Sequence, residues 1–249
     1  MTRRDDFTKR HMPLRSLVPN ILTVLALCAG LTAIRLGIQG NFELAAAMII
    51  VAGVLDGIDG RVARYLKGVS KIGAELDSLA DFVNFGVAPG IVLYIWVLQE
   101  VRGLGWIVVL AYVICCGLRL ARFNVMSREK EENGDNDNRF FTGVPSPAGA
   151  GLVLLPLFIW LAGIEGIRNN GGLIAVYVTG VGFLFVSRLP TYTFKTILVP
   201  RDHIMVVLIA SVLLVATLLT FPWISMVAVD LAYIGSMVWA YRAYGQKKP

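Results

Sequence analysis

Four aspartates form two pairs whose spacing suits a shared task. Asp56 and Asp59 are three residues apart, and Asp77 and Asp81 are four apart. On an α-helix either spacing places both side chains of a pair on one face. A short basic connection separates the pairs, so the two helices can return as antiparallel neighbours. All four carboxylates can then converge, and they repel one another strongly unless protons or cations neutralise them.

The donor set of this cluster consists of carboxylate oxygens only. Hard divalent cations such as Mg²⁺ or Mn²⁺ prefer oxygen ligands, and four aspartates can share two such ions. Two neighbouring ions suit attack at phosphorus, because the entering and leaving oxygens both need stabilisation. A structural ion site and a transport path are the alternatives. Transport sites tend to lie near the membrane midplane, whereas these aspartates lie near a helix end, which favours an enzyme.

Glycines accompany the aspartates at Gly57, Gly60 and Gly73. A helical glycine costs up to about 1 kcal/mol relative to alanine, so each of the three needs a reason. Close packing is one reason, since small residues are common where membrane helices touch. Room for a bulky ligand against the backbone is the other, and the neighbouring aspartates favour it here.

The elements that must position these residues are membrane helices. Hydrophobic residues make up 56% of the 249 residues and charged residues 16%, below the roughly 25% charge of soluble domains. Crossing a bilayer core takes about 20 apolar residues, and such segments recur along the chain. We predict an all-α, polytopic membrane helix bundle with about eight transmembrane helices, near residues 18–39, 42–65, 76–100, 104–124, 145–164, 171–188, 203–220 and 222–242.

Positive charge predicts the orientation of the bundle. With a cytoplasmic N-terminus, only Arg35, Arg102 and Arg168 of the 23 Lys and Arg fall on the opposite side. The positive-inside rule therefore predicts that both termini, and the aspartates, face the cytoplasm. The basic residues lie on separate loops, which argues against nucleic acid as a partner. Residues 1–17 are predicted to be a polar segment able to form a surface helix, and Ser127–Phe141 a polar loop.

The segment from Asp56 to Asp81 resembles the signature of the CDP-alcohol phosphotransferases. The pattern Asp-x2-Asp-Gly-x2-Ala-Arg-x8-Gly-x3-Asp-x3-Asp is matched at all eight fixed positions. Asn20 and Thr23 also resemble the family's usual opening of the first span. The resemblance implies a six-helix membrane core over residues 18–190, a two-helix extension over 191–249, and an integral protein of a prokaryotic inner membrane. Homodimers are frequent in this family.

The resemblance also implies a role for each matching residue. Asp56, Asp59 and Asp77 would be the principal ligands of two divalent cations, Mg²⁺ or Mn²⁺. Asp81 would be the general base for the acceptor hydroxyl and can touch the second metal. The predicted site for the CDP group comprises Asn20, Thr23, Asp56, Gly57, Asp59, Gly60, Ala63, Arg64, Gly73 and Asp77.

Two further stretches bear on the acceptor alcohol. Residues 119–124 (Arg-Leu-Ala-Arg-Phe-Asn) and 141–147 (Phe-Thr-Gly-Val-Pro-Ser-Pro) resemble the phosphatidylserine synthase branch of the family. Serine carries a carboxylate that arginines can hold by charge-assisted hydrogen bonds. Membrane anchoring is the alternative role for these arginines. The predicted acceptor site comprises Arg119, Arg122, Asn124, Pro145, Ser146 and Arg188.

The predicted reaction transfers the phosphatidyl group of CDP-diacylglycerol to L-serine and releases CMP. Glycerol 3-phosphate and inositol phosphate are alternative acceptors, because they are also anionic. Choline is a further alternative, although a cation of this kind favours an aromatic cage and the site region is poor in aromatic residues. A membrane transporter and an inactive lipid-binding relative are the alternatives of another class. The complete set of four aspartates argues against the inactive relative.

Overall fold

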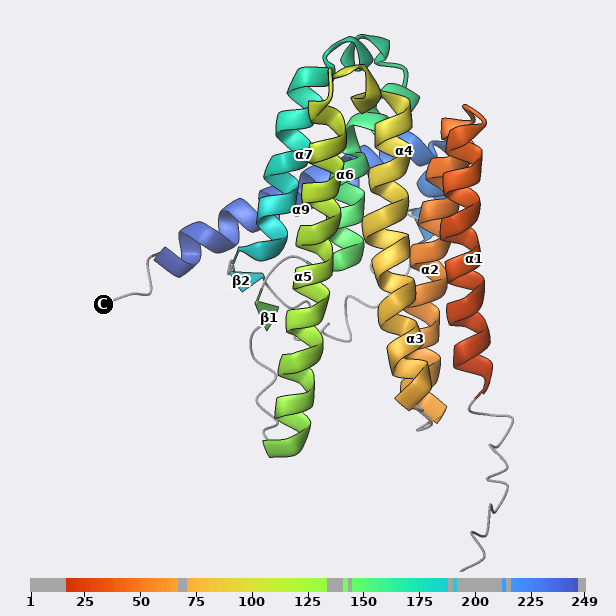
Figure 1. Cartoon of the computed structure of the whole chain (residues 1–249), viewed down its shortest axis with the longest axis vertical. Helices are drawn as coiled ribbons and strands as arrows, with labels where there is room; N and C mark the ends of the chain where they lie inside the picture. Colours follow the sequence, from red (N-terminus) through yellow and green to blue (C-terminus); the bar gives the residue numbers. More distant parts are fainter. Residues whose placement is uncertain are drawn as a thin grey trace, which may run out of the picture.

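A computed structural model describes residues 17–66, 71–133, 141–142, 145–187, 190–191, 212–213 and 216–245. Nearly all of this part of the chain is helical (Figure 1). The elements are α1 (Leu17–Ile38), α2 (Phe42–Leu66), α3 (Lys71–Asp81), η2 (Phe82–Val87), α4 (Ala88–Trp96), η3 (Leu98–Glu100), α5 (Leu104–Asn133), β1 (Phe141–Thr142), α6 (Ser146–Leu161), η4 (Glu165–Asn169), α7 (Gly171–Val186), β2 (Pro190–Thr191) and α9 (Pro222–Gly245).

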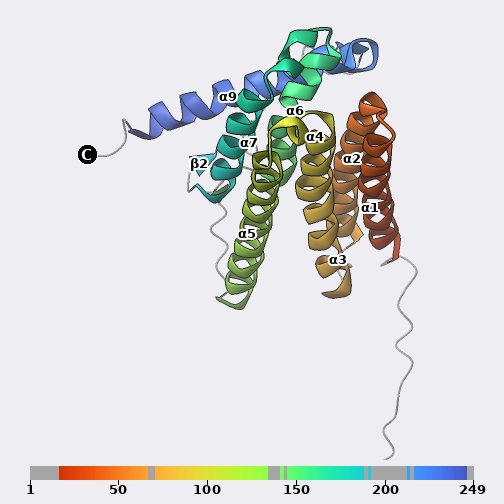
Figure 2. The same ribbon diagram turned by 45° about the horizontal axis from the view of Figure 1, so that its top comes forward.

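The long helices stand side by side as a bundle. α1 packs along α2, and α3, η2 and α4 follow one another as a single broken rod beside them (Figure 1). α5 packs along α7 on the other side, and α6 contacts α4, α7 and α9. α9 crosses the bundle obliquely in both views (Figures 1 and 2). The short strands β1 and β2 pair antiparallel and join the segment before α6 to the segment after α7.

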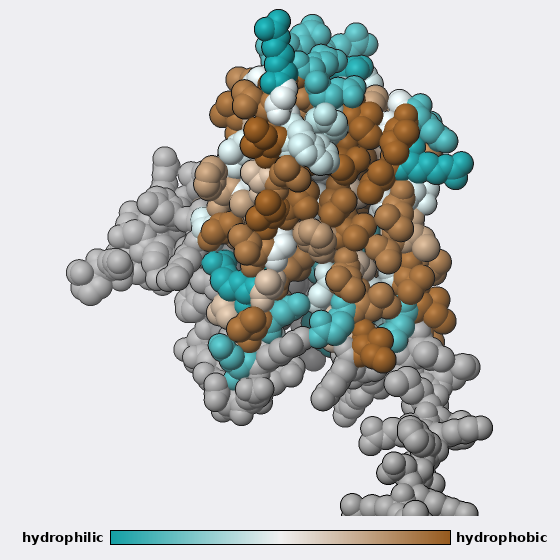
Figure 3. Space-filling view, viewed as in Figure 1, coloured by the Kyte–Doolittle hydropathy of each residue, from teal (hydrophilic) through white to brown (hydrophobic). Residues whose placement is uncertain are grey.

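The apolar surface of the bundle suits a bilayer. Three helices of the described part are long and apolar enough to cross a membrane: Val18–Ile38, Ile72–Trp96 and Leu104–Ser127. Shorter apolar helices cover Ser146–Leu161, Gly171–Val186 and Pro222–Met237. On the face shown in Figure 3, hydrophobic residues form a broad band between more polar ends. The predicted all-α, polytopic membrane bundle is therefore confirmed.

Several predicted helix limits differ from the observed ones. α5 continues to Asn133, whereas the predicted span ends at 124 and the predicted polar loop covers Ser127–Phe141. The extra turns contain Arg128, Lys130 and glutamates, which are good helix formers even outside a membrane. Of the predicted surface helix at 1–17 only Leu17 is described, and of the predicted span at 203–220 only residues 212–213 and 216–220 are described.

A π-helical segment, η2, separates α3 from α4. Pro89 lies in the first turn of α4 and lacks the N–H that would bond the carbonyl of Phe85. Tyr112 of α5, which is completely buried, donates its hydroxyl to that Phe85 carbonyl at 2.7 Å. The broken rod is therefore stabilised by a side chain from another helix, as a buried carbonyl requires.

The same arrangement recurs in α6. Pro156 lies inside this helix and frees the carbonyl of Leu152. Tyr177 of α7 donates its hydroxyl to the Leu152 oxygen at 2.6 Å. The two tyrosines thus join η2 to α5 and α6 to α7, in an apolar bundle where water cannot readily satisfy a carbonyl.

Candidate active site

Three of the four aspartates converge where α2 approaches α3. Asp56, Asp59 and Asp77 each offer a carboxylate oxygen, and these three oxygens lie within 4.8 Å of one another. Asp59 is almost fully buried, with 2% of its surface exposed. These three carboxylates therefore converge, as the helical spacing of the two pairs predicts. Oxygens this close form a donor set that suits a hard divalent cation.

Asp81 lies outside this group of three but next to it. It is the last residue of α3, at the point where η2 begins. Its side chain contacts Asp56 and interacts electrostatically with Asp77. One carboxylate oxygen, Oδ1, is buried and has no hydrogen-bond partner among the described residues. A buried, unpaired carboxylate oxygen beside other carboxylates is costly, so the site fits a bound cation or an incoming proton donor.

Thr23 of α1 fixes the orientation of Asp59. Its hydroxyl is buried and lies 2.8 Å from Oδ2 of Asp59 and 3.1 Å from the carbonyl oxygen of Pro19. A hydroxyl has one proton to donate, and the carboxylate is the stronger acceptor. Thr23 was predicted as a CDP contact, and that role stays a prediction. The contact with Asp59 is a supporting role of the kind that metal ligands commonly need.

The glycines beside the aspartates face open space. Apart from its chain neighbours and the backbone of its own helix, a Cβ atom added to Gly57 or Gly60 would meet no heavy atom of the described residues within 4 Å. By contrast, a Cβ on Gly30 would lie 2.1 Å from Oδ1 of Asn84, and one on Gly149 would lie 2.2 Å from the ring of Phe185. Helix packing therefore accounts for Gly30 and Gly149 but not for Gly57 and Gly60. The open space supports the ligand role predicted for these two.

The other residues of the predicted CDP site lie on the same three helices, within about one turn of Thr23, Gly60 or Asp77. Asn20 lies in the first turn of α1, one turn before Thr23, and Gly73 lies one turn before Asp77 on α3. Arg64 is exposed near the end of α2, and its Nε donates to the carbonyl of Gly60 at 2.9 Å. Ala63 precedes it on the same helix. Arg64 thus lies one turn beyond the open glycine.

Three of the predicted acceptor residues make contacts near the aspartates. Arg119 of α5 donates Nη1 to the hydroxyl of Ser146, the first residue of α6. Asn124 donates Nδ2 to Oγ of Ser78 at 2.9 Å, and Ser78 lies between Asp77 and Asp81 in α3. Ser78 is not among the site residues predicted from the sequence. Its position directly after Asp77 in the signature segment is the only local signal that could have identified it.

Arg119 links these acceptor residues to the aspartates. Its guanidinium interacts electrostatically with Asp81. Arg122 points elsewhere, because its Nη1 donates to the carbonyl of Val186 in α7 at 3.4 Å. Pro145 is exposed immediately before α6, and Arg188 lies outside the described residues. Arg119 and Ser146 therefore lie near the candidate site, whereas Arg122 contacts α7.

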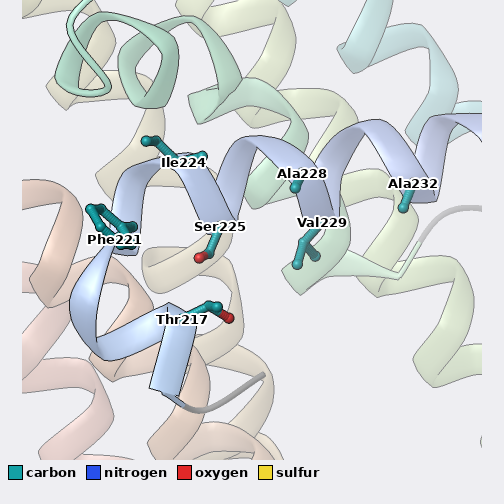
Figure 4. Close-up of a pocket in the computed structure, with 7 residues that line it drawn as sticks. All are labelled: Thr217, Phe221, Ile224, Ser225, Ala228, Val229 and Ala232. Carbon is teal, nitrogen blue, oxygen red and sulfur yellow. The ribbon is translucent and has the colours of Figure 1, made fainter. Parts of the chain in front are cut away.

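An apolar groove of about 530 Å³ lies on α9 and the segment before it (Figure 4). It is lined by Thr217, Phe221, Ile224, Ser225, Ala228, Val229 and Ala232. None of the predicted site residues lines this groove. Its apolar side chains suit the acyl chains of a bilayer, so the groove is not a second candidate for the chemistry.

Comparisons with known proteins agree with the geometry. A family model described as CDP-alcohol phosphatidyltransferase matches residues 16–186. The chain is 37% identical over 227 residues to the CDP-diacylglycerol–serine O-phosphatidyltransferase of Mycobacterium tuberculosis, covering 91% of this chain and 79% of the relative. It is 34% identical over 183 residues to the enzyme of the same name from Helicobacter pylori, covering 73% and 74%. It is 35% identical over 135 residues to the archaetidylserine synthase of Methanothermobacter thermautotrophicus, covering 53% and 54%.

Proposed function

Because the chain belongs to the CDP-alcohol phosphatidyltransferase family, we propose that it transfers the phosphatidyl group of CDP-diacylglycerol to the hydroxyl of L-serine. The products are phosphatidylserine and CMP. One observation carries the choice of serine: Arg119, which donates to Ser146, lies within electrostatic range of Asp81. A cation for the acceptor carboxylate and a base for the acceptor hydroxyl are thus neighbours.

The aspartates would hold two divalent cations, Mg²⁺ or Mn²⁺. Asp56, Asp59 and Asp77 would be the main ligands, with Asp81 at the edge of the set. When bound, such ions neutralise the diphosphate and stabilise charge on the oxygens that enter and leave phosphorus. Thr23 would keep the Asp59 carboxylate in one orientation through its hydrogen bond.

Asp81 would act as the general base. A serine hydroxyl is a weak nucleophile near neutral pH, and a carboxylate within hydrogen-bond reach can accept its proton as attack proceeds. The serine oxygen forms a bond to the phosphorus that bears the diacylglycerol, and the bond from this phosphorus to the CMP oxygen breaks. The proton passes to Asp81, whose Oδ1 is buried and has no partner among the described residues.

The guanidinium of Arg119 would bind the serine carboxylate by charge-assisted hydrogen bonds, with Ser146 holding the side chain in place. An arginine at this position repels choline, whose charge is positive. Glycerol 3-phosphate and inositol phosphate carry phosphates that an arginine also attracts, so they are the acceptors that a test must include.

The open space at Gly57 and Gly60 supports a CDP group lying against α2, with Asn20, Ala63, Arg64 and Gly73 around it. The acyl chains of the lipid would stay in the bilayer beside the bundle. The distribution of Lys and Arg supports a site that faces the cytoplasm in a prokaryotic inner membrane. A homodimer stays a prediction of the family resemblance, and the mass of the purified protein–detergent particle would test it.

CMP release by purified protein, with CDP-diacylglycerol and Mn²⁺ or Mg²⁺, tests the proposed reaction. Serine, glycerol 3-phosphate, inositol phosphate and choline are compared in parallel. We expect metal-dependent release with serine alone, and we expect Asp81→Asn to abolish it while largely sparing the binding of CDP-diacylglycerol. Release with a different acceptor refutes serine, and normal turnover by Asp81→Asn refutes the assigned base. Folded protein that releases no CMP with any acceptor refutes the enzymatic function.

A further inference from the structure

α9 lies beyond the residues matched by the family model, and its two faces differ. One face lines the apolar groove of Figure 4. The opposite face packs against the bundle core and carries Trp223, Met226, Asp230, Tyr233 and Met237. Their spacing of three and four residues is that of one helix face. Two polar side chains, Asp230 and Tyr233, are therefore directed into the protein.

Successive contacts fix the position of α9 on α6. Trp223 stacks on Phe158, with ring centroids 6.1 Å apart. Seven residues further along α9, Asp230 reaches Gly151, where an added Cβ would lie 2.8 Å from Asp230 Oδ1. The contacts thus move toward the start of α6 as α9 proceeds. Tyr233 follows Asp230 by one turn, and this order brings it toward the end of α6 that begins with Ser146.

Tyr233 meets the candidate acceptor site at this end. Its side chain interacts electrostatically with Arg119. Its hydroxyl is buried and has no hydrogen-bond partner within the described ranges. A buried phenol normally finds a partner, because leaving one unpaired costs free energy. The buried, unpaired hydroxyl therefore lies within electrostatic range of the Arg119 guanidinium that donates to Ser146.

We propose that Tyr233 is an acceptor-binding residue, whose hydroxyl donates a hydrogen bond to the anionic group of the acceptor that Arg119 also binds. For serine this group is the carboxylate, so the inference rests on the proposed function and extends its site. Arg119 interacts with Asp81 as well as with Tyr233. An acceptor held by Arg119 thus has one residue to receive its hydroxyl proton and another to bind its charged end.

The position of Tyr233 has a consequence for specificity. The aspartates, which act on the diphosphate of the donor, lie within residues 16–186, the part that the family model covers. Tyr233 lies outside that part, on a helix that packs against α6. A C-terminal helix can therefore select the acceptor without altering the groups that act on the donor.

Tyr233→Phe is the test, with Tyr177→Phe as the matched control. Both substitutions remove one tyrosine hydroxyl from helices that pack on α6. The Tyr177 hydroxyl, unlike that of Tyr233, already has a partner among the described residues, because it donates to the Leu152 carbonyl. A hydrogen bond to a charged group is worth enough to raise KM for serine roughly 10- to 100-fold. We expect that rise for Tyr233→Phe, with unchanged KM for CDP-diacylglycerol and unchanged Tm. For Tyr177→Phe we expect a lower Tm and an unchanged KM for serine.

L-Serinamide separates binding of the charged group from a general effect on the site. It keeps the hydroxyl and the amine of serine but lacks the carboxylate, so Tyr233→Phe should alter its use much less than that of serine. An unchanged KM for serine in Tyr233→Phe overturns the inference. The inference is also overturned if Tyr233→Phe loses activity equally with serine and with serinamide. A rise in KM for both serine and CDP-diacylglycerol, together with a lower Tm, overturns it as well.

The wild-type acceptor panel keeps this test independent of the choice of serine. If the wild type uses glycerol 3-phosphate or inositol phosphate instead, the proposed reaction fails. Tyr233→Phe is then measured with that acceptor. A raised KM supports the contact with the anionic group, and an unchanged KM refutes it.

Discussion

Gly60→Ala separates a ligand role of the signature glycines from a structural one. Gly60 lies in α2 one residue after Asp59, and an added Cβ would meet no other helix or loop of the described part of the chain within 4 Å. A glycine that served helix packing would show a close neighbour at this position. The substitution should therefore leave the fold intact and fill space that the CDP group of the donor would otherwise occupy.

The expected sizes of the two effects follow from this open space. Replacing a helical glycine by alanine stabilises a helix by roughly 0.5–1 kcal/mol when nothing clashes. For a protein of this size, that raises Tm by about 1–4 °C. A methyl group forced into space that a ligand fills costs about 1–3 kcal/mol of binding. KM for CDP-diacylglycerol should therefore rise roughly 10- to 100-fold.

The assay measures Tm in detergent together with CMP release over a range of CDP-diacylglycerol concentrations. Gly180→Ala is the matched control, because Gly180 lies within α7 and an added Cβ there also meets nothing within 4 Å. Both variants should keep or gain stability, and only Gly60→Ala should lose affinity for the donor. A Gly60→Ala variant with wild-type KM would refute the ligand role, and one with a lowered Tm would refute the open space.

Two further predictions concern supporting hydrogen bonds. Thr23→Val removes the hydroxyl that orients Asp59. The metal concentration giving half-maximal activity should then rise roughly 10- to 100-fold, as is usual when the partner of a metal ligand is lost; an unchanged metal titration would contradict this role. Tyr112→Phe leaves the buried Phe85 carbonyl without its donor and should lower the free energy of unfolding by roughly 1–3 kcal/mol. Denaturant titration in detergent measures the loss, and wild-type stability would show that another group satisfies this carbonyl.

The convergence of Asp56, Asp59 and Asp77 was predictable because helix geometry is local. Spacings of three and four residues determine which side chains share a face, and a short connection makes the two helices neighbours. Apolar runs indicate most helices for a similar reason, since bilayer thickness sets the length that each must reach. The end of α5 was predicted wrongly because hydropathy marks where a membrane ends, whereas Asn133 marks where the helix ends.

Contacts between distant helices were beyond these local rules. Asp230 and Tyr233 were recognisable as polar residues within an apolar segment, which invites a functional interpretation. Their spacing identifies a shared face of α9 but not the helix that this face meets. The groups they approach, Gly151 and Arg119, lie some 80 to 110 residues earlier in the chain. Only the three-dimensional packing of α9 across α6 relates them to the acceptor site.

The two prolines show which features of the fold the local sequence predicts and which depend on contacts with other helices. Pro89 and Pro156 each lack an N–H, so the sequence alone identifies the carbonyls of Phe85 and Leu152 as groups that need another donor. It does not identify Tyr112 and Tyr177 as those donors, because each belongs to a different helix. In a bilayer the need cannot be met by water, so each freed carbonyl specifies a helix–helix contact. The same reasoning applies to the Tyr233 hydroxyl, for which a bound acceptor is the partner we propose.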